Sequence, residues 1–256
     1  MADTPLKVWI ERDGRLLRLR LARPRANLID AEMIAALDGA LDEQRSNRGL
    51  CGVLLDHEGP NFSFGASVQE HLPENVAGML KSMHALVLAM VDYPVPILVS
   101  AAGQCLGGGL EVAMAGHLMF AAPTAKLGQP EIKLGVFAPA ASCLLGERIG
   151  RARAEDLLFS GRSVGGEEAL SMGLVNGLAD DPGSAALAYF DAHLAGSSAS
   201  SLRYAVGAAR AGYAKRIGDK LAEVEALYLS GLMTTRDAVE GLEAFIEKRP
   251  AKWERR

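Results

Sequence analysis

The chain has 256 residues, of which 49% are hydrophobic, 23% are charged and 5% are aromatic, and its formal net charge at pH 7 is −4. A chain of this length can bury roughly three quarters of its unfolded surface in one large domain, and its apolar fraction is too high for a disordered protein. Because the net charge is weakly negative, the chain is not one of the strongly basic proteins that bind nucleic acid through an overall excess of positive charge. A local basic pocket could still bind an anionic small ligand.

The N-terminal part of the chain predicts a hairpin, a helix and a strand. Two alternating apolar runs, 8–10 and 17–21, flank a turn signal at Asp13-Gly14, which is typical of a β-hairpin. Asp30 can cap a following helix whose apolar positions recur with the helical period. A short apolar run over 51–55 predicts the next strand.

The middle of the chain predicts a helix, a buried strand and a glycine turn. The helix covers 79–91, and the fully apolar strand over 97–102 follows it. Gly107-Gly108-Gly109 then leads into an alanine-rich helix. Glycines at such a turn allow close backbone approach, and the N-terminus of the helix would direct free N–H groups at a ligand. A tight turn in which only glycine fits is the alternative.

The C-terminal half is predicted to be mostly helical. From about Ala138 onward the pattern is helical except for one strand near 174–178, and three helical stretches occupy the tail. The small and polar residues at 196–200 form the best candidate boundary. We therefore predict a mixed α/β core over 1–195 and a helical C-terminal region over 196–256.

Cysteine usage and the N-terminal sequence predict a cytoplasmic protein. Cys51, Cys105 and Cys143 are widely spaced and form no metal-binding pattern, so we expect reduced, buried thiols. The N-terminal segment lacks the apolar stretch of a signal peptide, and no run of about 18 uncharged apolar residues occurs. We expect no membrane span and no membrane partner.

Two glutamates follow the glycine turn. Glu111 lies in the first turn of the predicted helix, and Glu131 lies in the loop segment Gly128-Gln129-Pro130-Glu131. Taken alone, Glu111 would complement the helix dipole and Glu131 would be a solvated carboxylate. Two carboxylates in one site can instead divide the roles of acid and base, because their environments separate their pKa values. Sequence spacing does not show whether they meet.

A second glycine segment could supply another free N–H group. A small residue, Ala66, follows Gly65, and two amides that converge on one oxygen form an oxyanion hole. None of the five histidines lies in a triad or zinc-protease motif, and His71 is of interest only because it follows this segment closely. The dinucleotide and Walker glycine motifs are absent.

Four motifs in register resemble the enoyl-CoA hydratase/isomerase, or crotonase, superfamily. They are F-S-F-G-A-S at 62–67, G-Q-C-L-G-G-G-L-E at 103–111, G-Q-P-E-I-K-L-G at 128–135 and E-G-L-E-A-F-I-E-K-R at 240–249. Each motif alone is weak, but their order and spacing hold over nearly the whole chain. The resemblance implies an α/β fold with a crotonase-like ββα spiral core, a C-terminal helical trimerisation region and a homohexamer.

The resemblance also implies a coenzyme A thioester substrate. The N–H groups of Ala66 and Gly108 would hold the thioester oxygen, and Glu111 and Glu131 would be the two catalytic glutamates of a hydratase. Because the pair is retained, addition of water is favoured. No metal and no separate cofactor are implied, since coenzyme A enters as part of the substrate.

Contacts to coenzyme A are implied at four further positions. Arg25 and Ala26 would contact it from the N-terminal loop, and Phe245 and Lys248 would contact it from a neighbouring subunit. Basic side chains there would form the local rim that the phosphates of the ligand need.

The implied acyl pocket departs from the commonest family pattern. Phe64 stands where a small residue is usual, and the segment 136–145 replaces a glycine-rich stretch, which would place Phe137, Ser142 and Cys143 beside the acyl group. For Ser142 and Cys143 alone, a buried small side chain is the favoured alternative. Added aromatic bulk is compatible with a flat ring. These segments are most similar to those of family members that hydrate a cyclic conjugated dienoyl-CoA in anaerobic benzoyl-CoA degradation.

Two other functions stay open. One is a short-chain enoyl-CoA hydratase or isomerase, which the segment 137–145 disfavours by resemblance only. The other is a non-catalytic acyl-CoA-binding or RNA-associated protein of the same fold. The retained glutamates argue against it, and the lack of a basic stripe argues against a nucleic-acid partner.

Overall fold

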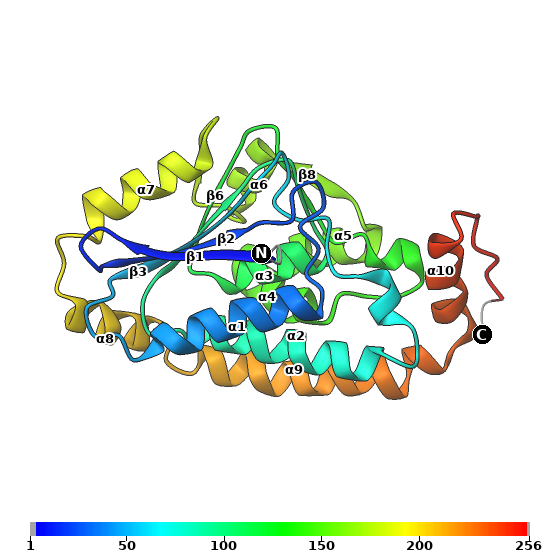
Figure 1. Ribbon diagram of the computed structural model, residues 1–256. Coiled ribbons are helices and arrows are strands. Elements are labelled where there is room, and N and C mark those ends of the chain that lie inside the picture. The colour runs from blue at the N-terminus through cyan, green and yellow to red at the C-terminus, as the bar shows by residue number, and fades with distance from the viewer. Residues whose placement is uncertain (1–3, 255–256) are drawn as a thin grey trace.

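Two sheets form the centre of the molecule (Figure 1). In the computed structural model, which describes residues 4–254, the larger sheet has the strand order β1-β2-β3-β4-β6-β9 and the smaller has the order β5-β7-β8. The strands are β1 Leu6–Glu11, β2 Leu16–Leu21, β3 Gly52–His57, β4 Ile97–Ala101, β5 Gln104–Leu106, β6 Leu118–Ala121, β7 Lys126–Gly128, β8 Ser163–Gly165 and β9 Gly177–Leu178.

Helices cover the sheets and continue into the C-terminal region (Figure 1). The α-helices are α1 Ala31–Arg45, α2 Val76–Val91, α3 Gly108–Ala115, α4 Pro139–Ile149, α5 Arg151–Ser160, α6 Gly166–Met172, α7 Pro182–His193, α8 Ala199–Ala209, α9 Tyr213–Ser230 and α10 Arg236–Ile246. Three short 3-10 helices are η1 Val68–His71, η2 Glu131–Leu134 and η3 Leu232–Thr234. No helix between residues 4 and 254 is long and apolar enough to cross a membrane.

The predicted hairpin and first helix are confirmed. β1 pairs antiparallel with β2, with Leu6 opposite Leu21. Asp30 caps α1, because its side chain accepts the N–H of Met33 at 3.0 Å. The following pairs β2–β3, β3–β4 and β4–β6 are all parallel, which explains why these strands are apolar on both faces.

Strand–strand–helix units repeat along the chain, as in β1-β2-α1 and β4-β5-α3. The predicted α/β fold is therefore confirmed. Four short strands, β5, β6, β7 and β8, were not predicted. Each has only three or four residues, so no alternation develops, and β7 is defined by its pairing with β5 and β8 rather than by its own sequence. The strand predicted near 174–178 is shortened to β9.

Three α-helices form the C-terminal tail, as predicted. α9 runs alongside α2 and also packs against α4 (Figure 1), and its residues Ile217, Leu221 and Tyr228 are buried in the main core. α10 lies at one end of the molecule, against η1 and η2. The boundary at 195/196 stays a prediction; α8 begins close to it, at Ala199.

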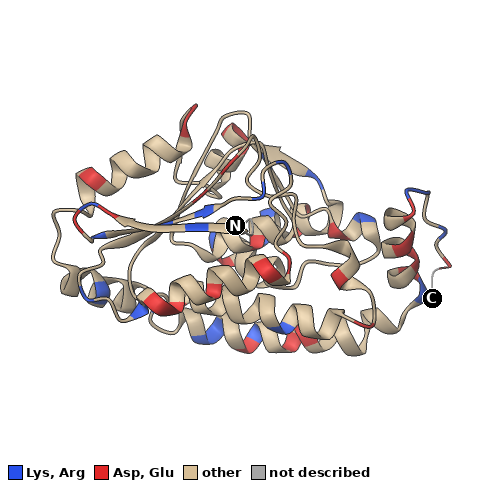
Figure 2. Cartoon of the chain, viewed as in Figure 1, with Lys and Arg blue, Asp and Glu red and all other residues tan. Residues whose placement is uncertain are grey.

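Charged residues are interspersed over the visible surface. Figure 2 shows both basic and acidic residues on the visible face, with no large area of one sign, in keeping with the small net charge. The three cysteines are buried and unpaired, as predicted.

Candidate active site

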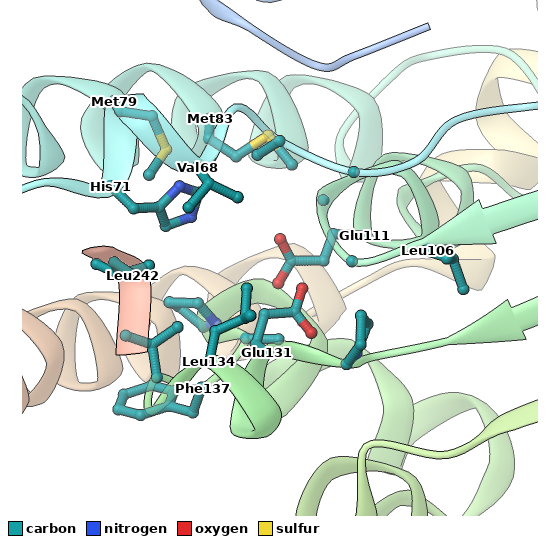
Figure 3. Close-up of a pocket in the computed structure, with 18 of the residues that line it drawn as sticks. Val68, His71, Met79, Met83, Leu106, Glu111, Glu131, Leu134, Phe137 and Leu242 are labelled. Carbon is teal, nitrogen blue, oxygen red and sulfur yellow. The ribbon is translucent and has the colours of Figure 1, made fainter. Parts of the chain in front are cut away.

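A cavity of about 410 Å³ lies among α2, α3, η1, η2 and α10 (Figure 3). Its walls are mostly apolar and include Val68, Met79, Leu80, Met83, Leu106, Leu134, Val136 and Leu242. Four ionisable side chains also reach it: His71, Glu111, Glu131 and Lys133. An apolar wall with a few convergent polar groups is typical of a small-molecule site.

Glu111 enters the cavity from the first turn of α3. It is 6% exposed, and its Oε1 accepts the N–H of Ala141 in α4 at 2.8 Å. Burial raises the pKa of Glu111 above its usual range, and the backbone N–H groups of Ala141 and Ala140 offset this only in part. The carboxyl group is therefore able to hold a proton near neutral pH.

Glu131 faces Glu111 across the cavity, and Figure 3 shows the two carboxyl groups turned toward one another. It lies at the start of η2. Burial and the negative charge of Glu111 raise the pKa of Glu131. Two carboxylates in such proximity favour a state in which the pair shares one proton, so one is an acid while the other is a base.

The buried side chain of Gln129 orients the carboxylate of Glu131. In the amide orientation that satisfies its own oxygen and nitrogen, the buried Gln129 side chain donates to Oε1 and Oε2 of Glu131 at 3.1 Å each. Gly107 leaves room on the other side. Its φ is +51°, and a Cβ there would lie 2.6 Å from Oε1 of Glu131. The glycine turn is therefore required both by its own conformation and by the close approach of the carboxylate.

The backbone N–H groups of Ala66 and Gly108 line the same cavity. Gly108 is the first residue of α3, so its N–H has no acceptor within the helix. Gly65 is anchored by its N–H to Ser63 Oγ and by its carbonyl to the N–H of Ile29, both at 3.0 Å, which fixes the backbone before Ala66. A Cβ on Gly108 would lie 3.1 Å from Ala66 N, so the two backbones are in close contact.

These two N–H groups can act together on one oxygen. Neither donates a backbone hydrogen bond within the described part of the chain. Two free donors, one of them at a helix N-terminus, suit an oxygen atom on which negative charge develops. The structure thus brings together all four residues that the sequence suggested for the reaction, two carboxylates and two backbone donors.

The predicted acyl-pocket residues divide into two pairs. Phe64 and Phe137 line the cavity, and the Phe137 ring packs edge-on against Tyr228 with 5.1 Å between ring centroids. Ser142 and Cys143 do not line it. Both lie in α4, which begins at Pro139, and the helical turn directs them to a separate depression beside α5 and α9. The Ser142 hydroxyl donates to the carbonyl of Ala138 at 2.7 Å.

The predicted coenzyme A contacts are also only partly at the cavity. Phe245 lines the cavity of its own chain, because α10 folds back against η1 and η2 and carries it there. The contact from a neighbouring subunit stays a prediction. Lys248 lies outside the lining. Arg25 and Ala26 lie beside the cavity, since the Ala26 carbonyl accepts the N–H of Phe64 at 2.9 Å.

Two lining residues, His71 and Lys133, had no assigned role in the sequence analysis. His71 Nδ1 lies 2.8 Å from the carbonyl of Ser67, to which it donates, and burial lowers the pKa of the imidazole. The neutral ring therefore offers Nε2 as an acceptor beside Val68 and Leu242 (Figure 3). Lys133 is exposed, and its position two residues after Glu131 was the available signal.

Comparison with known proteins gives consistent matches over the whole chain. The enoyl-CoA hydratase/isomerase family model matches residues 11–256. The chain is 65% identical over 255 residues to the cyclohexa-1,5-dienecarbonyl-CoA hydratase of Thauera aromatica, covering 100% of this chain and 99% of that protein. It is 32% identical to a probable enoyl-CoA hydratase of Bacillus subtilis, covering 90% and 92%. The crystal structure of an enoyl-CoA hydratase from Mycobacterium avium subsp. paratuberculosis shares the fold, with a TM-score of 0.85, 23% identity and coverage of 97% and 98%.

The coupling of the two carboxyl groups predicts the effect of removing one of them. Glu111→Gln is expected to lower the pKa of Glu131, because the negative charge that opposes its ionisation is gone while burial remains. The measurement is a ¹³C NMR titration of protein labelled at the glutamate carboxyl carbons. Glu243→Gln, on the exposed face of α10, is the matched control. An unchanged pKa of Glu131 in the Glu111 variant would show that the two carboxyl groups do not interact.

The same pair of carboxyl groups makes the free energy of unfolding depend on pH. Because folding raises both pKa values, the contribution of the pair to the free energy of unfolding is present at low pH and is lost as the pH rises through the raised values.

Proposed function

This chain belongs to the enoyl-CoA hydratase/isomerase family, and we propose that it is a hydro-lyase that adds water to a cyclic conjugated dienoyl-CoA. The substrate would be cyclohexa-1,5-diene-1-carbonyl-CoA and the product 6-hydroxycyclohex-1-ene-1-carbonyl-CoA, a step of anaerobic benzoyl-CoA degradation. The observation that carries the proposal is the full-length similarity to the Thauera aromatica hydratase. A cavity that holds two carboxyl groups opposite two free N–H groups supports it.

The two N–H groups would bind the thioester oxygen. When water attacks the ring carbon β to the thioester, negative charge moves onto that oxygen and along the second double bond. Ala66 and Gly108 would stabilise this dienolate, and loss of one such donor typically costs about 3–4 kcal/mol of transition-state stabilisation. Because the donors are backbone groups fixed before α3 and after Gly65, little reorganisation is needed as the charge develops.

The two glutamates would move the protons. The ionised carboxylate accepts a proton from water while the water oxygen bonds to the β-carbon. The protonated carboxyl group donates its proton to the far end of the second double bond, which completes a 1,4-addition and leaves the pair with one proton again. The raised pKa values of Glu111 and Glu131 support this division of roles near neutral pH.

The cavity walls would select a flat ring. Phe64 and Phe137 add aromatic surface to a lining that is otherwise aliphatic and excludes water from the dienolate. Phe245 of the same chain would close the cavity over the acyl group. Arg25, Ala26 and Lys248 would contact coenzyme A outside the cavity, with Lys133 adding a positive charge at its lining.

We also propose a cytoplasmic homohexamer that needs no separate cofactor. Large apolar side chains are exposed on the C-terminal helices, with Tyr204 of α8 at 83% and Leu227 of α9 at 62%. Such exposed apolar surfaces suit contacts between subunits, in which the region 196–256 of one chain would pack against the core 1–195 of another. Within residues 4–254, no cluster of three or more His, Cys, Asp or Glu side chains could hold a metal ion.

The substrate is tested by a comparison in heavy water. Fast hydration of cyclohexa-1,5-diene-1-carbonyl-CoA is expected, with deuterium on the ring carbon at the far end of the diene, because the proton is delivered there and not to the α-carbon. Mass spectrometry and NMR of the product locate the label. Preferential hydration of crotonyl-CoA would favour a short-chain hydratase, and binding of acyl-CoA without turnover of either substrate would favour a non-catalytic protein.

The roles of the glutamates are tested by isosteric substitution. Glu111→Gln and Glu131→Gln are each expected to lower kcat by roughly 10²–10⁴-fold with little change in KM, because each removes a proton transfer from the transition state. Glu243→Gln is expected to keep the parental rate. Near-parental hydration by both active-site variants would contradict the mechanism.

The assembly is tested by sedimentation equilibrium. A mass of six chains is expected for the parental protein, and Leu227→Lys is expected to lower it by placing a charge on the proposed interface. A parental mass of one chain would contradict the hexamer.

A further inference from the structure

A second cavity, of about 450 Å³, lies at the opposite end of α3 from Glu111. It is bounded by α4, the segment before β6, and the turn between α8 and α9. Its walls differ from those of the candidate active site, because basic and other hydrogen-bond-donating side chains predominate. These are His117, Arg148, Asn176, Arg210, Tyr213 and Arg216, with the Tyr213 ring beneath the guanidinium groups of Arg210 and Arg216.

Backbone carbonyls hold two of the guanidinium groups in place. Arg148 donates from Nε to the carbonyl of Leu174 at 2.9 Å and from Nη1 to that of Met114 at 3.1 Å. Arg210 donates from Nη1 to the carbonyl of Val91 at 2.8 Å. Within the described chain neither forms an ion pair with a carboxylate, and Nη2 of Arg148 has no acceptor.

The two guanidinium groups affect one another. Burial, together with the positive charge of Arg210, lowers the pKa of Arg148 to about 10. Burial likewise lowers the pKa of Arg210. Helix C-terminal carbonyls offset this charge only as partial dipoles, so the cavity keeps a positive field.

His117 adds a buried donor that has no acceptor. Its Nδ1 accepts the N–H of Ile97 at 3.0 Å, so the ring proton of the neutral imidazole must be on Nε2. Burial and the charges of Arg210 and Arg148 lower its pKa to about 3, which keeps the ring neutral. Nε2 is buried without a hydrogen-bond partner in the described chain. A buried donor of this kind is unfavourable unless an acceptor is supplied.

The other polar side chains of this cavity do not balance its excess of hydrogen-bond donors over acceptors. Asn176 uses its Oδ1 to accept the N–H of Met119 at 2.8 Å, which leaves its NH₂ group for the cavity. Glu147 is the carboxylate in the lining, and it is paired with Arg216 at 3.3 Å. Three guanidinium groups thus face one carboxylate, so two positive charges lack a counter-charge in the lining.

We propose that this cavity is a binding site for a small free oxyanion, of the phosphate or carboxylate class, separate from the acyl-CoA site. An oxyanion has only acceptor atoms and carries the missing negative charge, and guanidinium groups match its geometry. Bound there, it would accept from Arg148 Nη2 and from the amide nitrogen of Asn176, with the buried His117 Nε2 in the wall behind them. It would also link α4 to the turn after α8, and so stabilise the folded chain.

Thermal unfolding of the full-length protein tests the site. Tm is measured against inorganic phosphate, with chloride at matched ionic strength as the reference. A saturable rise in Tm is expected for the parental protein. Arg216→Gln, at an exposed position, is expected to raise the half-saturating phosphate concentration about tenfold, because it removes the partner of Glu147 and leaves that carboxylate to repel the anion. Arg151→Gln is the matched control, since this exposed arginine lines a different depression.

A second variant and a mass measurement complete the test. Arg148→Gln is expected to abolish the phosphate effect while hydration of acyl-CoA is retained, which separates this proposal from the proposed function. An equal rise in Tm for the parental and both lining variants would reveal a general ionic effect and overturn the proposal. A loss of assembly mass in Arg216→Gln, without a phosphate effect in the parental protein, would also overturn it, because a carboxylate of a second copy would then fill the cavity.

Discussion

The arrangement depends on two carboxyl groups that are kept close together and away from water. In solvent, Glu111 and Glu131 would both be ionised at neutral pH and would repel one another. Burial at the end of an apolar cavity raises both pKa values, so that the pair favours a shared proton. A site that contains one acid and one base at the same pH is the chemical outcome of that constraint, and several neighbouring elements serve to maintain it.

Backbone geometry supplies most of this support. The turn at Gly107 admits the Glu131 carboxylate, and the same turn ends at Gly108, whose free N–H opens α3. The two adjacent residues Gly107 and Gly108 therefore make room for the Glu131 carboxylate and supply one of the two oxyanion donors. Ala141 at the start of α4 supplies an N–H to Glu111, which ties the carboxylate to a second helix. The oxyanion donors and the carboxylates are thus already positioned by backbone elements in this structure, an arrangement that suits the stabilisation of developing charge.

The sequence predicted the parts of the molecule whose signals are local. The hairpin, the cap at Asp30 and the glycine turn each follow from a few adjacent residues, and the four reactive groups lie in motifs beside such turns. Signals that depend on three-dimensional packing were missed. The strands β5 to β8 are too short to show a period. The sequence also does not show that the start of α4 directs Ser142 and Cys143 to a separate depression. The position of Phe245 in the lining of its own chain was also missed, because a sequence cannot show that α10 folds back on the core.

The donor-rich cavity was not predicted from the sequence, because it too depends on three-dimensional packing. Its guanidinium groups come from α4, α9 and the turn before α9, and each is an ordinary surface-type residue in its own segment. Only their meeting around His117 creates an excess of donors. The two cavities adjoin the same short helix, α3, but differ in their electrostatics. The candidate active site is apolar and raises the pKa of its acids, whereas the donor-rich cavity gathers positive charge.

The proposed mechanism requires one ligand to engage both pairs of groups at once. A crystal structure with 6-hydroxycyclohex-1-ene-1-carbonyl-CoA bound tests this requirement. We expect the thioester oxygen within hydrogen-bonding distance of the N–H groups of Ala66 and Gly108, with the ring hydroxyl beside the carboxyl groups of Glu111 and Glu131. A thioester oxygen bound elsewhere, or a ring that leaves either glutamate out of reach of the reacting carbons, would contradict it.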